Sequence, residues 1–245
     1  AWRKNGKWLF DLIASERIKR NVLQALPFWV ASLAVGVMAV MYAWLFAQAE
    51  RLMLHLLVST QWVIFLLTPC CFVMAWWVVH YFAPNARGSG IPQVMAAIDL
   101  ASSRREPKLG RLLSLKIILV KILSSLLMVL GGGAVGREGP TIQVAGSIFY
   151  TINKHIPASW PKLSRQSYLL TGAAAGLAAA FNTPLGGMVF AMEELAKIHV
   201  RFFRMALFAA VIIAGLTGQG VIGPYLYPGY AAVTPFSLYL FAAGI

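Results

Sequence analysis

Four long stretches without a charged side chain constrain the fold of this chain more than any other feature. They cover residues 21–49, 52–86, 166–192 and 205–245. A helix needs about 20 consecutive, mainly apolar residues to cross the hydrocarbon core of a bilayer. Only 12% of the residues are charged, whereas a soluble domain carries roughly a quarter. The sequence therefore predicts an all-α polytopic membrane protein.

The net charge of +13 is gathered at the ends of apolar segments. One basic cluster precedes the first segment and the other follows the second. These residues are Arg3, Lys4, Lys7, Arg17, Lys19, Arg20, then Arg104, Arg105, Lys108 and Arg111. Cytoplasmic loops of membrane proteins are rich in Lys and Arg, so both clusters are expected on the cytoplasmic side, with two spans between them. This charge pattern indicates membrane topology rather than nucleic-acid binding.

Two domains are expected from the position of the polar residues. Residues 1–20 lack the short apolar core of a cleaved signal peptide, and we expect a cytoplasmic or interfacial helix there. Residues 21–245 form the expected transmembrane domain. Its last apolar segment, from about residue 234, is too short to cross a bilayer, which predicts that the chain is part of a longer protein.

Several apolar segments of the expected transmembrane domain are short or broken. We expect spans over 22–49, 60–83, 111–130 and 203–222, and short helices over 93–101 and 140–153, with a polar loop up to residue 110. A break at 182–184 divides the stretch 166–195. Interrupted helices of this kind build substrate sites at membrane depth in transporters, so the pattern predicts broken and re-entrant helices around a binding site.

A charged motif lies inside the apolar sequence. It consists of Gly136, Arg137, Glu138, Gly139 and Pro140. Ionisable residues at membrane depth are costly and usually functional. Pro140 suits the first turn of a helix. A helix that starts here directs free N–H groups and its positive dipole end forward, which suits an anion.

A second motif combines glycines with a hydroxyl group. It consists of Gly88, Ser89, Gly90, Ile91 and Pro92. A hydroxyl donor at a helix start can hold a halide through partial charges, without a full positive charge. The alternative is that Ser89 is a plain N-cap of the following helix.

These motifs, in their order, resemble the chloride channel and chloride/proton antiporter (CLC) family. Two further motifs add to the resemblance: residues 181–187 (Phe-Asn-Thr-Pro-Leu-Gly-Gly) and Glu193-Glu194. The resemblance covers nearly the whole chain, but only the first half of the family's inverted repeat. The family's second-half Gly-x-Phe-x-Pro motif and its pore tyrosine have no counterpart in this sequence.

The resemblance implies a chloride/proton antiporter, with a passive voltage- or proton-gated chloride channel as the alternative. It implies that the two glycine motifs form the anion filter and that Ser89 coordinates chloride. Glu138 would act as gate and proton carrier, and Glu194 as the internal proton-transfer residue. From the residues alone, Glu138 is also explained as a capping carboxylate paired with Arg137. Glu194 is also explained as part of a solvated helix end, with an i,i+3 ion pair to Lys197.

Other features of the assembly and chemistry follow from the same resemblance. It implies an integral membrane homodimer with a complete pore in each subunit, contacts from residues 185–220, and no cofactor. The histidines His55, His80, His155 and His199 show no metal-ligand spacing. Gly131, Gly133 and Gly136 fit a dinucleotide-loop spacing, but no predicted strand precedes them. A serine hydrolase using Ser89 with His155 or His199 is the competing hypothesis of another class.

Lys121 lies within an apolar helix, which is an unusual place for a cation. The resemblance implies that in some antiporters of the family a matching lysine pairs with an acid, and here the corresponding residue is Met95. Three alternatives stay open for Lys121: its stem reaches along the helix to a polar boundary, its ammonium binds backbone carbonyls, or it is a neutral amine.

Overall fold

The computed structural model is built from helices. It describes residues 16–102, 106–157, 160, 163–190, 193 and 205–222. Every regular element in these residues is helical. The α-helices are α2 (Glu16–Ser59), α3 (Ile64–Phe82), α4 (Ile91–Ser102), α5 (Glu106–Leu112), α6 (Leu115–Leu130), α7 (Glu138–His155), α8 (Arg165–Phe181), α9 (Pro184–Phe190) and α10 (Met205–Ile222), with 3₁₀ turns η1 (Gln61–Val63) and η2 (Pro84–Ala86).

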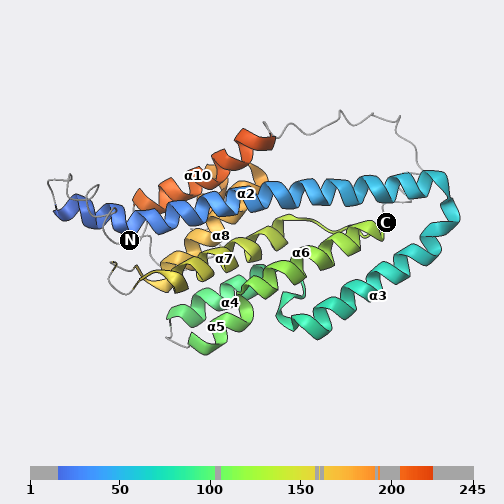
Figure 1. The fold of residues 1–245 in the computed structure, drawn as a ribbon, viewed down its shortest axis with the longest axis horizontal. Helices are drawn as coiled ribbons and strands as arrows, with labels where there is room; N and C mark the ends of the chain where they lie inside the picture. Colours follow the sequence, from blue (N-terminus) through green and yellow to red (C-terminus); the bar gives the residue numbers. More distant parts are fainter. Residues whose placement is uncertain are drawn as a thin grey trace, which may run out of the picture.

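Helix α2 runs along the whole molecule, and α3 returns in the opposite direction and packs beside α6 (Figure 1). With 44 residues, α2 is about 66 Å long at about 1.5 Å per residue. The expected end of the first span at residue 49 is wrong, because no glycine or proline follows Gly36 before Ser59 to stop the helix. Among the described residues, three helices are long and apolar enough to span a membrane: Asn21–Ser59, Ile64–Phe82 and Leu109–Leu130.

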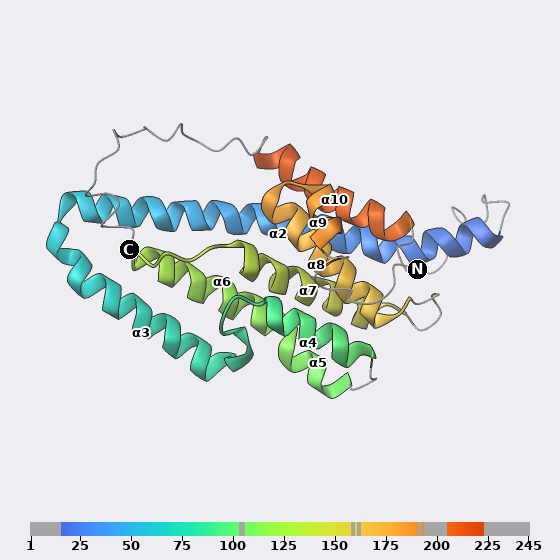
Figure 2. The ribbon, with the colours of Figure 1, turned by 180° about the vertical axis from the view of Figure 1, so that it is seen from behind.

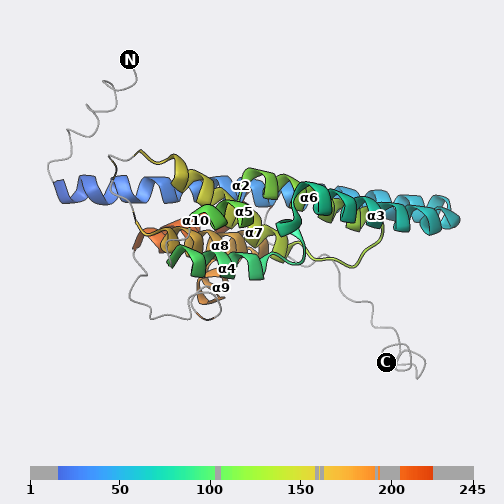
Figure 3. The same cartoon turned by 90° about the horizontal axis from the view of Figure 1, so that it is seen from below.

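The core lies where α2, α7, α8 and α10 pack together. Phe28 of α2 stacks on Tyr168 of α8, with 4.0 Å between ring centroids, and Phe149 of α7 meets the same phenylalanine edge-on. A Cβ on Gly176 of α8 would lie 2.6 Å from the Cβ of Ala145 on α7. The small residues therefore let α7 and α8 lie in close contact, as the views from behind and from below show (Figures 2 and 3).

Two boundaries differ from the sequence-based expectation and one agrees with it. The polar loop expected up to residue 110 contains the short helix α5. Helix α6 begins at Leu115 rather than about residue 111, because the Ser114 hydroxyl caps it by accepting from the N–H of Ile117. The predicted break at 182–184 is confirmed: Asn182 ends α8 in the left-handed conformation, with φ of 57°, and Pro184 starts α9.

Candidate anion-binding site

A cavity of about 680 Å³ lies between α3, α6, the loop before α4 and the start of α7. Both glycine motifs contribute to its wall, together with polar side chains of α6 and an otherwise apolar lining. The lining residues are Phe72, Ala75, Trp76, Val79, Ala86, Arg87, Gly88, Ser89, Lys121, Ser124, Ser125, Met128, Val135, Gly136, Glu138, Gly139 and Pro140. The fold thus brings together two motifs that are far apart in the sequence.

The two motifs are in direct contact at the backbone. A Cβ on Gly139 would lie 2.8 Å from the carbonyl oxygen of Ser89, and one on Gly90 would lie 3.1 Å from the carbonyl oxygen of Gly139. Gly88 and Gly90 have φ values of +71° and +104°, which glycine adopts at little cost. The residue types of both motifs are therefore needed for the two helix starts to meet.

The start of α7 offers backbone donors to the cavity. The N–H of Thr141 donates to the carbonyl of Arg137 at 3.0 Å, and the preceding N–H groups of a helix have no partner within it. Pro140 carries no N–H, so the free donors of this turn belong to Glu138 and Gly139, and both residues line the cavity. Such donors and the positive end of the helix dipole stabilise a negative charge.

The Glu138 side chain folds back over its own helix start. Its carboxylate Oε2 lies 2.6 Å from the point where a Cβ on Gly136 would be. The side chain is half-buried and lines the cavity. A carboxylate at this position lies in the same wall that offers its donors to an anion.

Lys121 is bound by backbone carbonyls. Its side chain is 2% exposed, and its Nζ donates to the carbonyl of Ala86 at 2.7 Å and to that of Gly88 at 2.6 Å. Of the three alternatives from the sequence, the carbonyl-binding one describes the structure. Met95, at the position where by the resemblance some antiporters of the family carry an acid, is packed against an apolar cluster of α4, α7 and α8.

Four consecutive carbonyls before Ser89 each accept a hydrogen bond from a side chain. Gln143 Nε2 donates to the carbonyl of Asn85 at 3.1 Å, and Gln93 Nε2 donates to that of Arg87 at 2.7 Å. Lys121 holds the two others. Because carbonyl oxygens repel an anion, this arrangement leaves the N–H groups and the Ser89 hydroxyl as the groups of the loop suited to a halide.

Gln143 was missed by the sequence reasoning. It is fully buried in α7 and also donates to the carbonyl of Leu112, at 3.3 Å. A buried amide is costly unless it is hydrogen-bonded, so a glutamine five residues after Glu138 in an apolar helix was the available signal. It ties the loop before α4 to α7 and to the end of α5.

Comparison with protein-family models matches residues 70–245 to the voltage gated chloride channel family. The chain belongs to this family. Its all-α, multi-pass membrane fold, predicted from the sequence, is thereby confirmed.

Curated relatives in the family are named H(+)/Cl(-) exchange transporter ClcA. The protein of Vibrio cholerae serotype O1 (strain ATCC 39315 / El Tor Inaba N16961) is 34% identical over 204 residues, which are 77% of this chain and 41% of the relative. The protein of Vibrio parahaemolyticus serotype O3:K6 (strain RIMD 2210633) is 34% identical over 176 residues, 69% of this chain and 35% of the relative. The chain thus spans about two fifths of the length of these relatives.

Several predicted residues of the family motifs lie away from the large cavity. Arg137 lines a separate small cavity of about 10 Å³ with residues of α2, α8 and α10, among them Asn182. Gly90 is buried against Gln143, and Ile91 and Pro92 form the first turn of α4. Glu194 lies outside the described residues, so its role stays a prediction.

One of the two histidines in the serine hydrolase hypothesis, His155, lies too far from Ser89 to act with it. His155 ends α7, about 25 Å from the helix start near Ser89 at 1.5 Å per residue, and its Nδ1 lies 2.8 Å from the carbonyl of Thr151. His199 lies outside the described residues. The dinucleotide-loop spacing of Gly131, Gly133 and Gly136 follows a helix, α6, rather than a strand.

Proposed function

We propose that the protein exchanges chloride for protons across a membrane, with chloride bound in the cavity beside Ser89. The observation that carries this proposal is the meeting of two helix starts at one cavity whose wall also holds the Glu138 carboxylate. The names of the relatives, which are exchange transporters, support the same reaction. No catalytic step and no cofactor belong to this proposal; chloride and protons are the transported species.

Glu138 is the proposed gate and proton carrier. In its ionised form it competes with chloride for the donors at the start of α7, since both are anions. Protonation removes the charge and weakens this attachment, so the side chain can leave and admit chloride. One side chain thereby couples proton movement to chloride movement. Glu194 is the proposed second proton carrier, on the resemblance alone.

A passive chloride channel with the same cavity is the second candidate. It requires the same anion-binding groups and the same gate, but no proton carried through the protein. The printed names of the relatives favour exchange. The two functions differ in whether a chloride gradient drives protons.

The test uses the full-length protein in liposomes, with chloride and proton movements recorded together. We expect Glu138→Gln to keep chloride flux and to abolish chloride-driven proton movement, because the amide copies a protonated carboxyl that cannot release its proton. Asp99→Asn is the matched control, since Asp99 is exposed on α4. It should leave both movements unchanged.

Three results would contradict parts of the proposal. Proton movement that survives Glu138→Gln rules out Glu138 as the carrier. Proton movement that survives Glu194→Gln rules out Glu194. A reversal potential of the unaltered protein that ignores the pH gradient indicates the passive channel.

We further propose a homodimer in the inner or plasma membrane with a cytoplasmic N-terminus. Phe208, Ile212 and Leu216 are exposed at four-residue spacing on α10, which places them on one helix face. This apolar stripe falls in the region expected to contact a second subunit. The molecular mass of the detergent-solubilised full-length protein tests the dimer, and a monomeric mass would contradict it.

A further inference from the structure

A pair of buried hydroxyl groups lies beside the cavity and has no part in the function proposed so far. The Tyr42 hydroxyl of α2 donates to Ser125 Oγ of α6 at 2.7 Å. Tyr42 is 1% exposed and Ser125 is 9% exposed. Ser125 lines the same cavity as Ser89 and Glu138.

Because Ser125 Oγ accepts the hydrogen bond from Tyr42, the serine hydroxyl can donate its own proton to a different acceptor. Tyr42 has one hydroxyl proton, and it points to Ser125. The Ser125 hydroxyl donates a hydrogen bond to the carbonyl of Ile122 at 2.8 Å, which as a helix carbonyl also accepts an N–H from the next turn. A hydroxyl that accepts one hydrogen bond becomes a stronger donor of another. The Ser125 proton can therefore rotate to a better acceptor at little cost.

The position of Ser125 along α6 suits an anion in the cavity. It is four residues from Lys121, so the two side chains share a helix face, with about 6 Å between their Cβ atoms. Lys121 contacts the carbonyl of Gly88, beside Ser89. Of the neighbouring lining residues, Phe72, Met128 and Val135 offer no side-chain donor, and the Ser124 hydroxyl donates to the carbonyl of Lys121 at 3.1 Å.

We propose that Ser125, polarised by Tyr42, is a further hydroxyl donor to the halide in the cavity, in addition to Ser89. The proposal rests on the proposed function and adds a halide-binding position to it. When chloride arrives, the Ser125 proton turns from the carbonyl of Ile122 to the anion, while Tyr42 keeps donating to Ser125. Two neutral hydroxyls then stabilise the halide without a full positive charge, which favours release as well as binding.

The experiment measures chloride binding by titration calorimetry on the full-length protein in detergent, in a Glu138→Ala background that removes the competing carboxylate. We expect Ser125→Ala to raise the chloride Kd about fivefold and Tyr42→Phe to raise it about threefold, in line with the loss of one neutral hydrogen bond. Ser125→Thr keeps the hydroxyl and should keep the affinity. Adding Tyr42→Phe to Ser125→Ala should have no further effect.

Two matched variants control for loss of a buried hydroxyl elsewhere. Ser147→Ala removes a fully buried serine of α7 that donates to the carbonyl of Gln143 at 2.8 Å. Tyr168→Phe removes the hydroxyl of a buried tyrosine that stacks on Phe28. Both should leave the chloride Kd unchanged.

Distinct results overturn the inference and the function beneath it. A background protein that binds chloride with the same Kd after Ser125→Ala overturns the hydroxyl pair alone. An effect that appears only when Glu138 is present assigns the pair to the carboxylate and also overturns it. Equal effects of Tyr42→Phe with and without Ser125 rule out polarisation of Ser125 by Tyr42. A background protein that binds no chloride overturns both the inference and the proposed function.

Discussion

At the residue scale, the candidate site depends on side chains that bind the backbone around the cavity. The carbonyls of residues 85–88 accept hydrogen bonds from the side chains of Lys121, Gln93 and Gln143. The sequence predicted that Lys121 was anomalous, because a charge within an apolar helix needs a partner. It could not name the partner, since the carbonyls belong to a loop more than thirty residues away in the chain.

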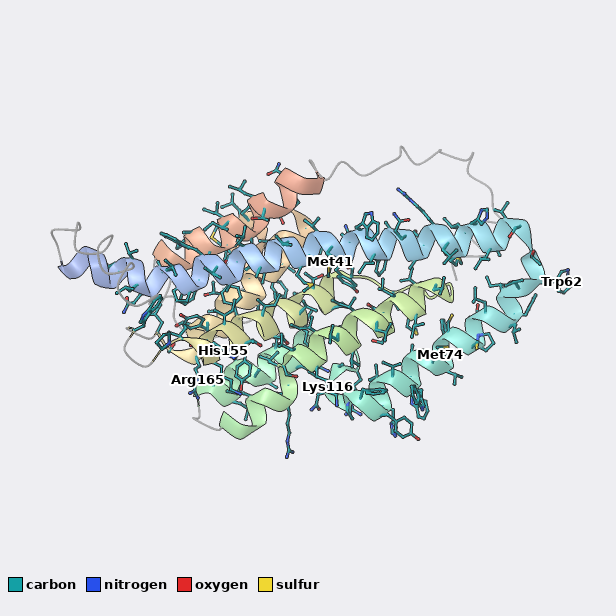
Figure 4. The ribbon with its side chains drawn as sticks, in the orientation of Figure 1. Met41, Trp62, Met74, Lys116, His155 and Arg165 are labelled. Atoms are coloured by element: carbon teal, nitrogen blue, oxygen red, sulfur yellow. The ribbon has the colours of Figure 1, made fainter. Side chains whose placement is uncertain are left out.

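Lys121→Met should weaken chloride binding by about tenfold, or about 1.4 kcal/mol, because two carbonyls lose their charged donor and part of that loss reaches the anion. The freed carbonyls of Ala86 and Gly88 would then be able to turn toward the anion. Titration of the full-length protein with chloride measures this change. Lys116→Met is the control: Lys116 is exposed on the same helix, with its Nζ 6.0 Å from the centre of the Phe82 ring (Figure 4). Equal losses in both variants would contradict the role of Lys121.

At the element scale, the sequence predicted where helices exist better than where they end. The break at 182–184 was predictable because Asn and Pro act locally, as a left-handed cap and a helix start. The length of α2 and the existence of α5 were not predicted. Charged residues such as Glu50 and Arg51 suggest the edge of the membrane, but they do not stop a helix, since Glu and Arg are good helix formers.

The contact of α7 with α8 fixes the start of α7, and Gly176→Ala tests it. The new Cβ would lie 2.6 Å from the Cβ of Ala145 and 3.1 Å from the carbonyl oxygen of Thr141. Such overpacking costs about 1–3 kcal/mol, so we expect a lower midpoint of thermal unfolding and reduced chloride flux. Gly220→Ala has open space around it and should not lower the midpoint. An unchanged midpoint for Gly176→Ala would contradict close packing at this contact.

At the scale of the whole molecule, the site requires the motif residues and also the contact between the two motifs. The residues of this sequence predicted the first but not the second. The motif residues and their helix starts were predicted, because glycine, proline and charge are local signals in an apolar chain. Their contact across Ser89 and Gly139 came from the resemblance, since spacing alone does not bring two motifs together. The hydroxyl pair of Tyr42 and Ser125 joins two helices at long range, and neither residue stands out in the sequence.

The orientation of the molecule can be tested by labelling its two ends. Trp62 lies at the turn between α2 and α3, and His155 lies at the opposite end of the molecule (Figure 4). Trp62 is 80% exposed and His155 is exposed. With the basic clusters in the cytoplasm, we expect an impermeant maleimide to label Trp62→Cys on intact cells.

The companion variant His155→Cys should react only after the cells are permeabilised. Both variants are made in the full-length protein with Cys70→Ser and Cys71→Ala, which remove the two native thiols of the chain. The control is the full-length protein with only Cys70→Ser and Cys71→Ala. Residues 1–245 of this control should not react with the maleimide. The reverse pattern, with His155→Cys labelled from outside, would show that the N-terminus is not cytoplasmic.

The occupied carbonyls of residues 85–88 have a consequence for the sign of the ion that can pass. A peptide unit has an oxygen edge and a nitrogen edge, and pores selective for potassium present the oxygen edge to the ion. Here side chains of α4, α6 and α7 donate hydrogen bonds to the carbonyl oxygens of residues 85–88, so these oxygens already have partners within the protein. In the proposed exchanger, preference for a negative over a positive ion then depends in part on Gln93 and Gln143, which are not among the lining residues of the cavity.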